Sequence, residues 1–251
     1  MNILVCVKRV PFTGGKINLT ADGQEIDTRY LGFTISPHEE CAVEEAVRLV
    51  EAHGGSAAVL TLGPAAAEEQ LREAMALGVE RAILLETDGR EWDAGATAAA
   101  IVEAVRAVGA NFDLLLFGNE AADTGDYQVG IRVAHALDLP CVTGVKSLAI
   151  KEGKAIARRE SSGGWEIFEA PLPAVITVKE GINLPRYPSL PGRLKAKKKP
   201  VDRLQPQWKG NALEKARLKL PAEAEHQVEV LGKGAGAAPK AVEILRRLGL
   251  V

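Results

Sequence analysis

Short apolar runs alternate with segments of helical periodicity over the first half of the chain. The runs lie at residues 2–7, 57–62, 81–86 and 113–117. Each run is continuously apolar, which is typical of strands that are covered on both faces. Between the runs, apolar residues recur at helical spacing. Strands that alternate with helices in this way predict βαβ units and a mostly parallel sheet with right-handed crossovers.

Start and stop signals place the helices between these strands. Ser36 can cap the first helix, Pro37 suits its first position, and Glu39 completes a capping box. A second helix is expected to stop at Gly78, and a third is expected to open at Asp93.

Beyond residue 140 the pattern changes to short strands. Residues 142–150, 154–160 and 165–169 are separated by glycine-containing turns, so they predict an antiparallel meander. This meander is followed by a buried strand at residues 174–178. A helix is expected over residues 128–137, before the meander.

The expected fold is therefore α/β, with a doubly wound and mostly parallel sheet, an antiparallel extension and a long C-terminal arm. We expect one domain over residues 1–200, in which residues 8–34 show no clear period. The arm, residues 201–251, has a weak helix near 213–218 and an amphipathic helix over 239–250. A tail of this length without its own core is expected to lie on another surface.

The segment of residues 179–200 changes character after the buried strand before it. Three prolines at 185, 188 and 191 predict an exposed loop, because proline disfavours both helices and strand ladders. Leu190 is apolar within this loop, and a run of arginine and lysine follows it. The segment is either a surface for a partner or a solvated exit with a charge run.

Composition limits the class of protein. The 251 residues are 47% hydrophobic and 25% charged, which is ordinary globular composition. The formal charge of −2 gives no general attraction to nucleic acid, and the basic run lacks interleaved aromatic residues. The three cysteines do not form a disulfide framework, and no apolar run approaches a membrane span. With no targeting segment before the first strand, we expect a cytoplasmic protein of a prokaryote.

Candidate chemistry gathers where parallel strands end. Ligands bind beyond the carboxyl ends of the strands in such sheets, near the switch in strand order. The loop after the fourth strand, GNEAADTGDYQVG at residues 118–130, has three glycines and leads into a helix N-terminus, which suits a nucleotide phosphate. It equally suits a polar loop capped by its own aspartates. The four histidines are scattered without metal-ligand spacing, so we expect no metal or hydrolytic site.

Several motifs together resemble the β subunit of electron transfer flavoproteins over essentially the full chain. They are VKRV at residues 7–10, SPHEECAVEEAVRL at 36–49, GPA at 63–65 and PRYPSLPGRLKAKKKP at 185–200. The resemblance implies a nucleotide-binding fold similar to that of adenine nucleotide hydrolases, and an electron carrier without substrate turnover of its own. It also implies an α/β heterodimer that takes electrons from dehydrogenases, such as acyl-CoA dehydrogenases, and passes them to a quinone-linked oxidoreductase.

The resemblance further implies that FAD sits mainly on the α subunit and that the β subunit holds a structural AMP. The residues it assigns to the nucleotide are Cys6, Ser36, Pro37, His38, Glu39, Leu62, Gly118, Asn119, Glu120, Ala121, Ala122, Asp123, Thr124, Gly125, Asp126, Tyr127, Gln128 and Val129. Residues 8–12 and His38 would lie nearest the flavin of the α subunit.

The resemblance also assigns residues to partner recognition. Leu190 matches a leucine that inserts into a pocket on the partner dehydrogenase, and Arg193 lies beside it. Lys195 and Lys198 match lysines that are methylated in some relatives.

Two alternatives stay open. The loop reads DTGDYQVG, which resembles relatives that bifurcate electrons and hold a second FAD in place of AMP. A nucleotide-binding module of the universal-stress type would share the alternating fold without a redox role.

Overall fold

Strands make one large sheet and one small sheet in the computed structural model, which describes residues 1–12, 14–109, 111–221 and 229–251. Over these residues the large sheet has nine strands in the order β11-β5-β4-β1-β6-β10-β7-β8-β9, and the small one pairs β2 with β3. The strands are β1 (Asn2–Cys6), β2 (Arg9–Pro11), β3 (Phe33–Ile35), β4 (Ser56–Gly63), β5 (Arg81–Glu86), β6 (Leu114–Gly118), β7 (Cys141–Lys151), β8 (Lys154–Ser161), β9 (Gly164–Pro171), β10 (Ala174–Val178) and β11 (Val201–Leu204).

Parallel pairing runs from β11 through β5, β4, β1, β6 and β10 to β7. The β7–β8–β9 extension is antiparallel. The α/β fold class and the meander predicted from the sequence are therefore confirmed. The continuous apolar runs are explained by burial on both faces, as for Ile3 and Leu4, which are adjacent in β1 and belong to separate core clusters.

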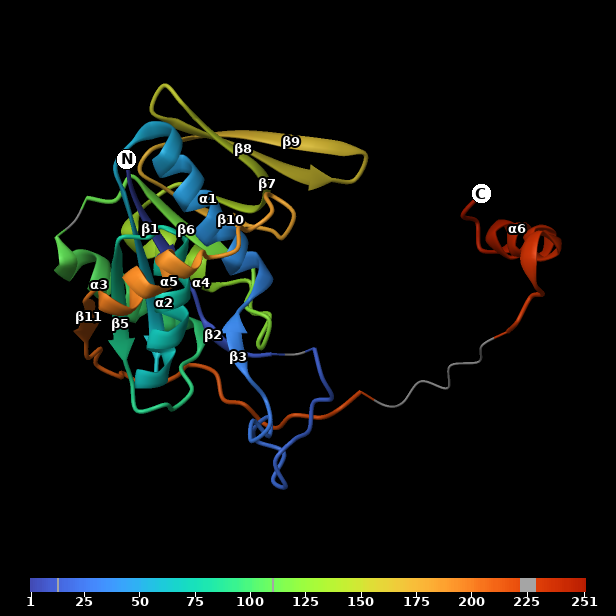
Figure 1. Ribbon diagram of the computed structural model, residues 1–251, viewed down its shortest axis with the longest axis horizontal. Helices are drawn as coiled ribbons and strands as arrows, with labels where there is room; N and C mark the ends of the chain where they lie inside the picture. The colour runs from blue at the N-terminus through green and yellow to red at the C-terminus, as the bar shows by residue number, and fades with distance from the viewer. Residues whose placement is uncertain (13, 110, 222–228) are drawn as a thin grey trace. The chain divides into compact units, whose positions relative to one another are not determined.

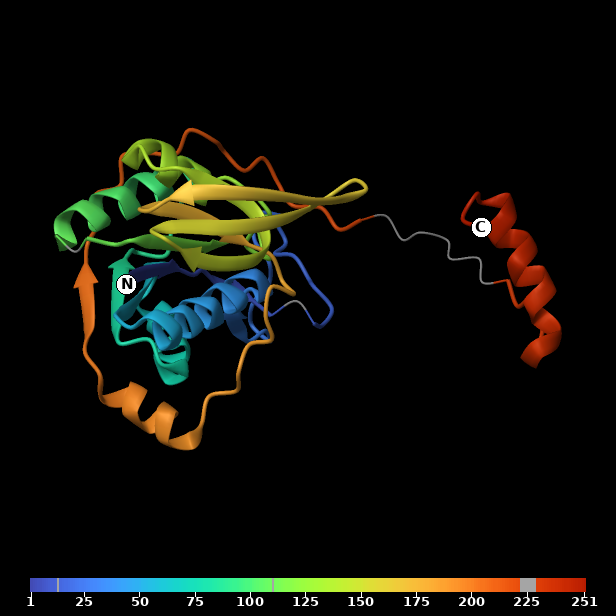
Figure 2. The same cartoon turned by 90° about the horizontal axis from the view of Figure 1, so that it is seen from above.

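Helices cover both faces of the parallel strands. The α-helices are α1 (Pro37–His53), α2 (Glu68–Leu77), α3 (Ala94–Val108), α4 (Val129–Leu137), α5 (Leu190–Lys198) and α6 (Ala238–Arg247), with 3-10 turns at Ala65–Ala67 and Gly234–Ala237. Helices α1 and α2 pack on one face and α3 and α4 on the other (Figures 1 and 2). Among the described helices, none has the length and apolar character needed to cross a membrane.

The predicted ends of the helices are largely as expected. Asp93 caps α3 by accepting a hydrogen bond from the backbone N–H of Ala96 at 2.7 Å. Gly78 follows α2 with a positive φ. The predicted capping role of the Ser36 side chain is wrong, because its hydroxyl donates to the carbonyl of Glu120 instead of accepting from the helix.

Segment 179–200 differs from the expected exposed loop. Residues 190–198 form α5, because Pro191 occupies its first turn, where proline costs no hydrogen bond. Ser189 caps this helix by accepting from the backbone N–H of Gly192 at 3.1 Å. Helix α5 packs against α2.

Two further strand pairs were not predicted. Residues 9–11 and 33–35, in the stretch without a period, form the small antiparallel sheet. Residues 201–204, expected in the arm, form β11 at the edge of the large sheet, parallel to β5. The weak helix expected near residues 213–218 does not form.

The chain divides into two compact units, Met1–Arg217 and Leu218–Val251. The first unit continues beyond the boundary expected at residue 200 because β11 belongs to its sheet. The second unit contains the predicted C-terminal helix, α6, whose residues are not buried. Its stripe of Val242, Leu245 and Leu248 is exposed.

Candidate functional site

A buried carboxyl group joins two segments at the switch in strand order. The switch lies between β1 and β6, since β4 and β5 follow on one side of β1 while β6 and β10 lie on the other. Lys8 follows β1, and its backbone N–H donates to Oε2 of Glu39 at 2.9 Å. The end of β1 and the first turn of α1 are thereby held together at the sheet edge where ligands bind in this class of fold.

Glu39 is only 7% exposed. Burial raises its pKa to about 8, although the backbone N–H and ammonium of Lys8 and the backbone N–H of Ser36 act in the opposite direction. Glu39 is therefore mostly protonated near neutral pH. A neutral Glu39 adds no negative charge to a site proposed to hold an anion.

The loop after β6 passes very close to α1. A Cβ on Gly118 would lie 2.6 Å from Cγ of Glu39 and 3.0 Å from its backbone nitrogen, so only glycine permits this approach. The next residue, Asn119, accepts a hydrogen bond from the hydroxyl of Thr177 on β10 at 2.8 Å. The loop therefore begins in a fixed position between α1 and β10.

Polar contacts tie the rest of this loop to the two neighbouring segments. Nζ of Lys8 lies 2.7 Å from Oδ2 of Asp123. The hydroxyl of Ser36 donates to the carbonyl oxygen of Glu120 at 3.4 Å, and Nε2 of His38 lies 3.7 Å from the Glu120 carboxylate. Polar contacts thus connect the end of β1, the start of α1 and the loop after β6, which are far apart in sequence.

His38 supplies a polar atom that the chain leaves unsatisfied. Its Nδ1 is buried and finds no hydrogen-bond partner within the part of the chain that the structure describes. Burial also lowers the pKa of His38, which favours the neutral ring, although Glu120 opposes this shift. A buried nitrogen of this kind fits a site in which a bound molecule supplies the partner.

The first turn of α4 offers a second feature suited to a ligand. Gln128 precedes this helix, and its side chain does not cap it. Its side-chain oxygen instead accepts from the guanidinium of Arg132 at 2.8 and 3.0 Å. N–H groups at a helix start without a side-chain cap favour an anion.

The structure brings the predicted nucleotide residues to one edge of the sheet. Cys6 ends β1 and Leu62 lies near the end of β4, while Ser36, Pro37, His38 and Glu39 begin α1 and residues 118–129 follow β6. Burial and the nearby Glu39 raise the pKa of Cys6, so its thiol stays protonated. Ala122, Asp123, Thr124, Asp126 and Tyr127 are exposed on the loop.

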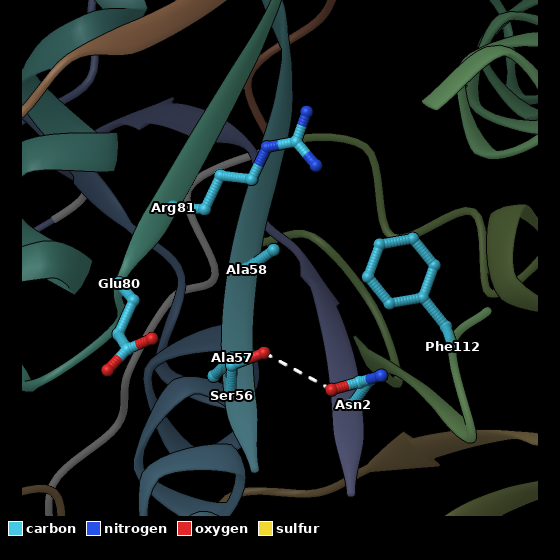
Figure 3. Close-up of a pocket in the computed structure, with 7 residues that line it drawn as sticks. All are labelled: Asn2, Ser56, Ala57, Ala58, Glu80, Arg81 and Phe112. Carbon is cyan, nitrogen blue, oxygen red and sulfur yellow. Dashed lines mark hydrogen bonds between the residues drawn. The ribbon is translucent and has the colours of Figure 1, made fainter. Parts of the chain in front are cut away.

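A pocket of about 270 Å³ lies at the opposite edge of the sheet. It is lined by Asn2, Ser56, Ala57, Ala58, Glu80, Arg81 and Phe112, which precede or begin β1, β4, β5 and β6. Figure 3 shows the ring of Phe112 across from the strands and the hydrogen bond from Ser56 to Asn2. The amino ends of parallel strands are not where this fold class binds its ligands, so this pocket is not the candidate site.

The predicted partner-recognition residues are displayed on α5. Leu190 begins this helix with 71% of its surface exposed. Arg193, Lys195 and Lys198 are also exposed. Sequence reasoning did not single out Tyr187, which precedes α5 and is 96% exposed.

Sequence reasoning also missed how this segment is attached. Arg186 donates to the carboxylates of Glu44 and Glu51 on α1 at distances of 2.6 to 3.2 Å. The two glutamates are seven residues apart and so share a helix face, which the sequence does reveal. Their partner is more than a hundred residues away, and no local pattern points to it.

Among the described residues, histidine, cysteine and acidic side chains form no cluster of three or more that could hold a metal ion.

Comparisons with known proteins agree with one another. The model of the electron transfer flavoprotein domain matches residues 25–207. The chain is 39% identical over 212 residues to the electron transfer flavoprotein subunit beta of Bacillus subtilis, which covers 82% of this chain and 79% of that one. It is 41% identical to the subunit beta of Syntrophomonas wolfei over 80% of this chain and 78% of that one. It is 34% identical to the caffeyl-CoA reductase-Etf complex subunit CarD of Acetobacterium woodii over 80% of this chain and 77% of that one.

Proposed function

The chain belongs to the electron transfer flavoprotein family as a β subunit, and we propose that it carries electrons from dehydrogenases, such as acyl-CoA dehydrogenases, to a quinone-linked oxidoreductase. Members of this family are electron carriers and not enzymes with their own substrate. A β subunit works with an α subunit, and we place the redox FAD mainly on that partner. Bound flavin would supply the electron-accepting group. The C-terminal arm of this chain would pack on the α subunit.

The nucleotide site of this chain would lie at the switch between β1 and β6. The observation that carries this proposal is the buried Nδ1 of His38, which has no hydrogen-bond partner among the described residues. It lies beside a loop that only Gly118 allows so close to α1. The backbone N–H groups at the start of α4 would donate hydrogen bonds to a phosphate. A protonated Glu39, together with the pairing of Asp123 by Lys8, limits the repulsion of that phosphate.

AMP in a structural role is the first candidate for this site. The loop DTGDYQVG and the 34% identity to a subunit of a caffeyl-CoA reductase-Etf complex favour a second candidate, an additional FAD. Both share the adenosine and phosphate groups that the site would hold. Residues 8–12, which include the exposed Phe12, would then lie nearest the α-subunit flavin.

Mass spectrometry of released nucleotides separates these candidates. The heterodimer is purified, denatured and its soluble nucleotides are identified and counted. One FAD and one AMP per heterodimer are the expected result. Two FAD would favour the second candidate, and a heterodimer without any bound adenine nucleotide on the β chain would refute the site. In that case the universal-stress alternative would fail as well.

Docking of the dehydrogenase would depend on Leu190. A fully buried leucine contributes roughly 1.5–3 kcal/mol, which can bias an encounter without fixing a rigid complex. Such a limited anchor suits a carrier that serves unlike partners. The exposed lysines beside it would attract acidic partners and make association sensitive to salt.

Replacing Leu190 by alanine tests this docking role. We expect the rate of heterodimer reduction by a substrate-reduced acyl-CoA dehydrogenase to fall about tenfold or more at low enzyme concentration, with unchanged flavin content. Ile167→Ala is the matched control, since Ile167 is 61% exposed on β9 and lies outside both residues 179–200 and the C-terminal arm. Equal rates for the wild type and Leu190→Ala would refute the anchor.

A further inference from the structure

Arg186 is one of the residues that attach residues 179–200, here called the docking segment, to α1. Nε and Nη2 of Arg186 donate to the two carboxylate oxygens of Glu44 at 2.9 and 3.0 Å. Nη1 and Nη2 donate to the two oxygens of Glu51 at 2.6 and 2.9 Å. The guanidinium thus bridges two turns of α1. We call this arrangement the Arg186 clamp, formed by Arg186, Glu44 and Glu51.

The Arg186 clamp is more than an ordinary surface ion pair. Exposed ion pairs contribute little to stability, because water and salt screen the charges and the side chains lose conformational freedom. Glu44, however, is only 4% exposed, so its carboxylate depends on the arginine. The backbone N–H of Arg186 also donates to Glu44 at 3.1 Å. This last contact fixes the main chain and not only the side chain.

Other contacts restrain the same segment on both sides of Leu190. Before it, the side chain of Asn183 donates to Glu45 at 2.9 Å and to the carbonyl oxygen of Cys41 at 3.0 Å. After it, Arg72 on α2 donates to the carbonyl oxygens of Ala196 and Lys199, the latter at 2.8 Å.

Gly192 shows how closely α5 approaches α2. A Cβ at this position would lie 2.6 Å from the carbonyl oxygen of Ala76, at the end of α2. These attachments leave Leu190 and Tyr187 uncovered, with exposures of 71% and 96%. The apolar side chains are therefore displayed from a main chain that is fixed before the partner arrives.

We propose that Arg186 is a positioning residue, and that the Arg186 clamp holds Leu190 in the orientation in which it enters a pocket on the dehydrogenase. This inference rests on the proposed docking role of Leu190. A segment that is already ordered loses less conformational entropy on binding. Each side chain that is ordered beforehand therefore makes the free energy of association more favourable. The clamp acts on encounter and not on the electron transfer that follows.

Glu51→Gln is the most informative variant because it weakens the clamp while making the surface more positive. If Arg186 acted only by attracting an acidic dehydrogenase, removing the competing Glu51 charge would strengthen association. If Arg186 acts by positioning, the same change weakens association. Arg186→Lys, which keeps the charge but loses the two-pronged geometry, is expected to behave like Glu51→Gln. Glu152→Gln, on an exposed turn, is the charge-matched control.

The assay uses the full heterodimer and an acyl-CoA dehydrogenase reduced by its acyl-CoA substrate. For Glu51→Gln and Arg186→Lys we expect KM for the heterodimer to rise about two- to tenfold with unchanged kcat. Hydrogen–deuterium exchange over residues 182–199 should become faster in both variants and stay unchanged in Glu152→Gln. In a Leu190→Ala background, Glu51→Gln should produce no further change in KM.

The outcomes separate the clamp from the docking proposal on which it rests. If Leu190→Ala lowers the rate but Glu51→Gln leaves KM unchanged or lowers it, docking stands and the positioning role is overturned. Unchanged exchange in both Glu51→Gln and Arg186→Lys also overturns it, because the segment is then not held by the clamp. If Leu190→Ala has no effect on KM, the docking proposal fails, and the positioning role fails with it whatever the exchange shows.

Discussion

Glu39 is expected to make the stability of the chain depend on pH in a direction opposite to that of a salt-bridged acid. An unfolded glutamate loses its proton near pH 4.5, whereas burial raises the pKa of Glu39 to about 8 in the folded chain. Between these values the folded state holds one proton more than the unfolded state. Stability is therefore fully present below about pH 4.5 and is lost as pH rises toward 8.

The size of this effect follows from the two pKa values. Each pH unit well between them costs about 1.4 kcal/mol, and the cost is smaller close to each pKa, so the loss from pH 4.5 to pH 8 is on the order of 4 kcal/mol. For a chain of this length, 1 kcal/mol corresponds to about 2–4 °C in Tm. The contribution of Glu39 to the fall in Tm between pH 5 and pH 8 is therefore on the order of 10 °C.

Glu39→Gln isolates this contribution, because glutamine resembles the protonated acid at every pH. Thermal unfolding of the full chain is measured from pH 5 to pH 9 for the wild type, Glu39→Gln and the exposed control Glu152→Gln. The Tm of Glu39→Gln minus that of the wild type should grow as pH rises and level off above pH 8. A difference that does not change with pH would refute the assignment of Glu39 as a buried, protonated acid.

The remaining predictions concern the loop after β6. Gly118→Ala should weaken nucleotide retention about tenfold or more, because the Cβ of the alanine would lie 2.6 Å from Cγ of Glu39. Nucleotide retained after dialysis measures this effect, and full retention would contradict the close approach. Thr177→Val should lower the free energy of unfolding by about 1–3 kcal/mol. The substitution removes the hydroxyl that donates to Asn119 and accepts from the backbone N–H of Gly144 at 3.2 Å. Chemical denaturation measures this loss, and an unchanged midpoint would contradict the prediction.

Local sequence determined the parallel strands at the centre of the large sheet and the sheet edge that carries the candidate site. Continuous apolar runs identify the parallel strands, since a strand buried on both faces leaves no polar positions. Asp93 and Gly78 mark helix ends through contacts only a few residues long. Because parallel strands share a carboxyl edge, residues 36–39 and 118–129 could be assigned to one place before the structure was known.

Contacts between distant segments were beyond such reasoning. The side chain of Ser36 was expected to cap α1, but its hydroxyl donates to the carbonyl oxygen of Glu120, 84 residues away. Pro191 was expected to prevent a helix, whereas its position in the first turn, after Ser189, allows one. The sequence alone could not show that β11 would find the open edge of β5, because its four residues have no strong pattern of their own.

The chemistry of the site was likewise decided by tertiary structure. The sequence places glutamates at 39, 44 and 51 on one helix and says nothing of their differences. Burial beneath the loop after β6 raises the pKa of Glu39, while Arg186 pairs with Glu44 and Glu51. Residue type and periodicity thus determine which elements form. The desolvation and pairing that give identical side chains different roles depend on which distant segments fold against them.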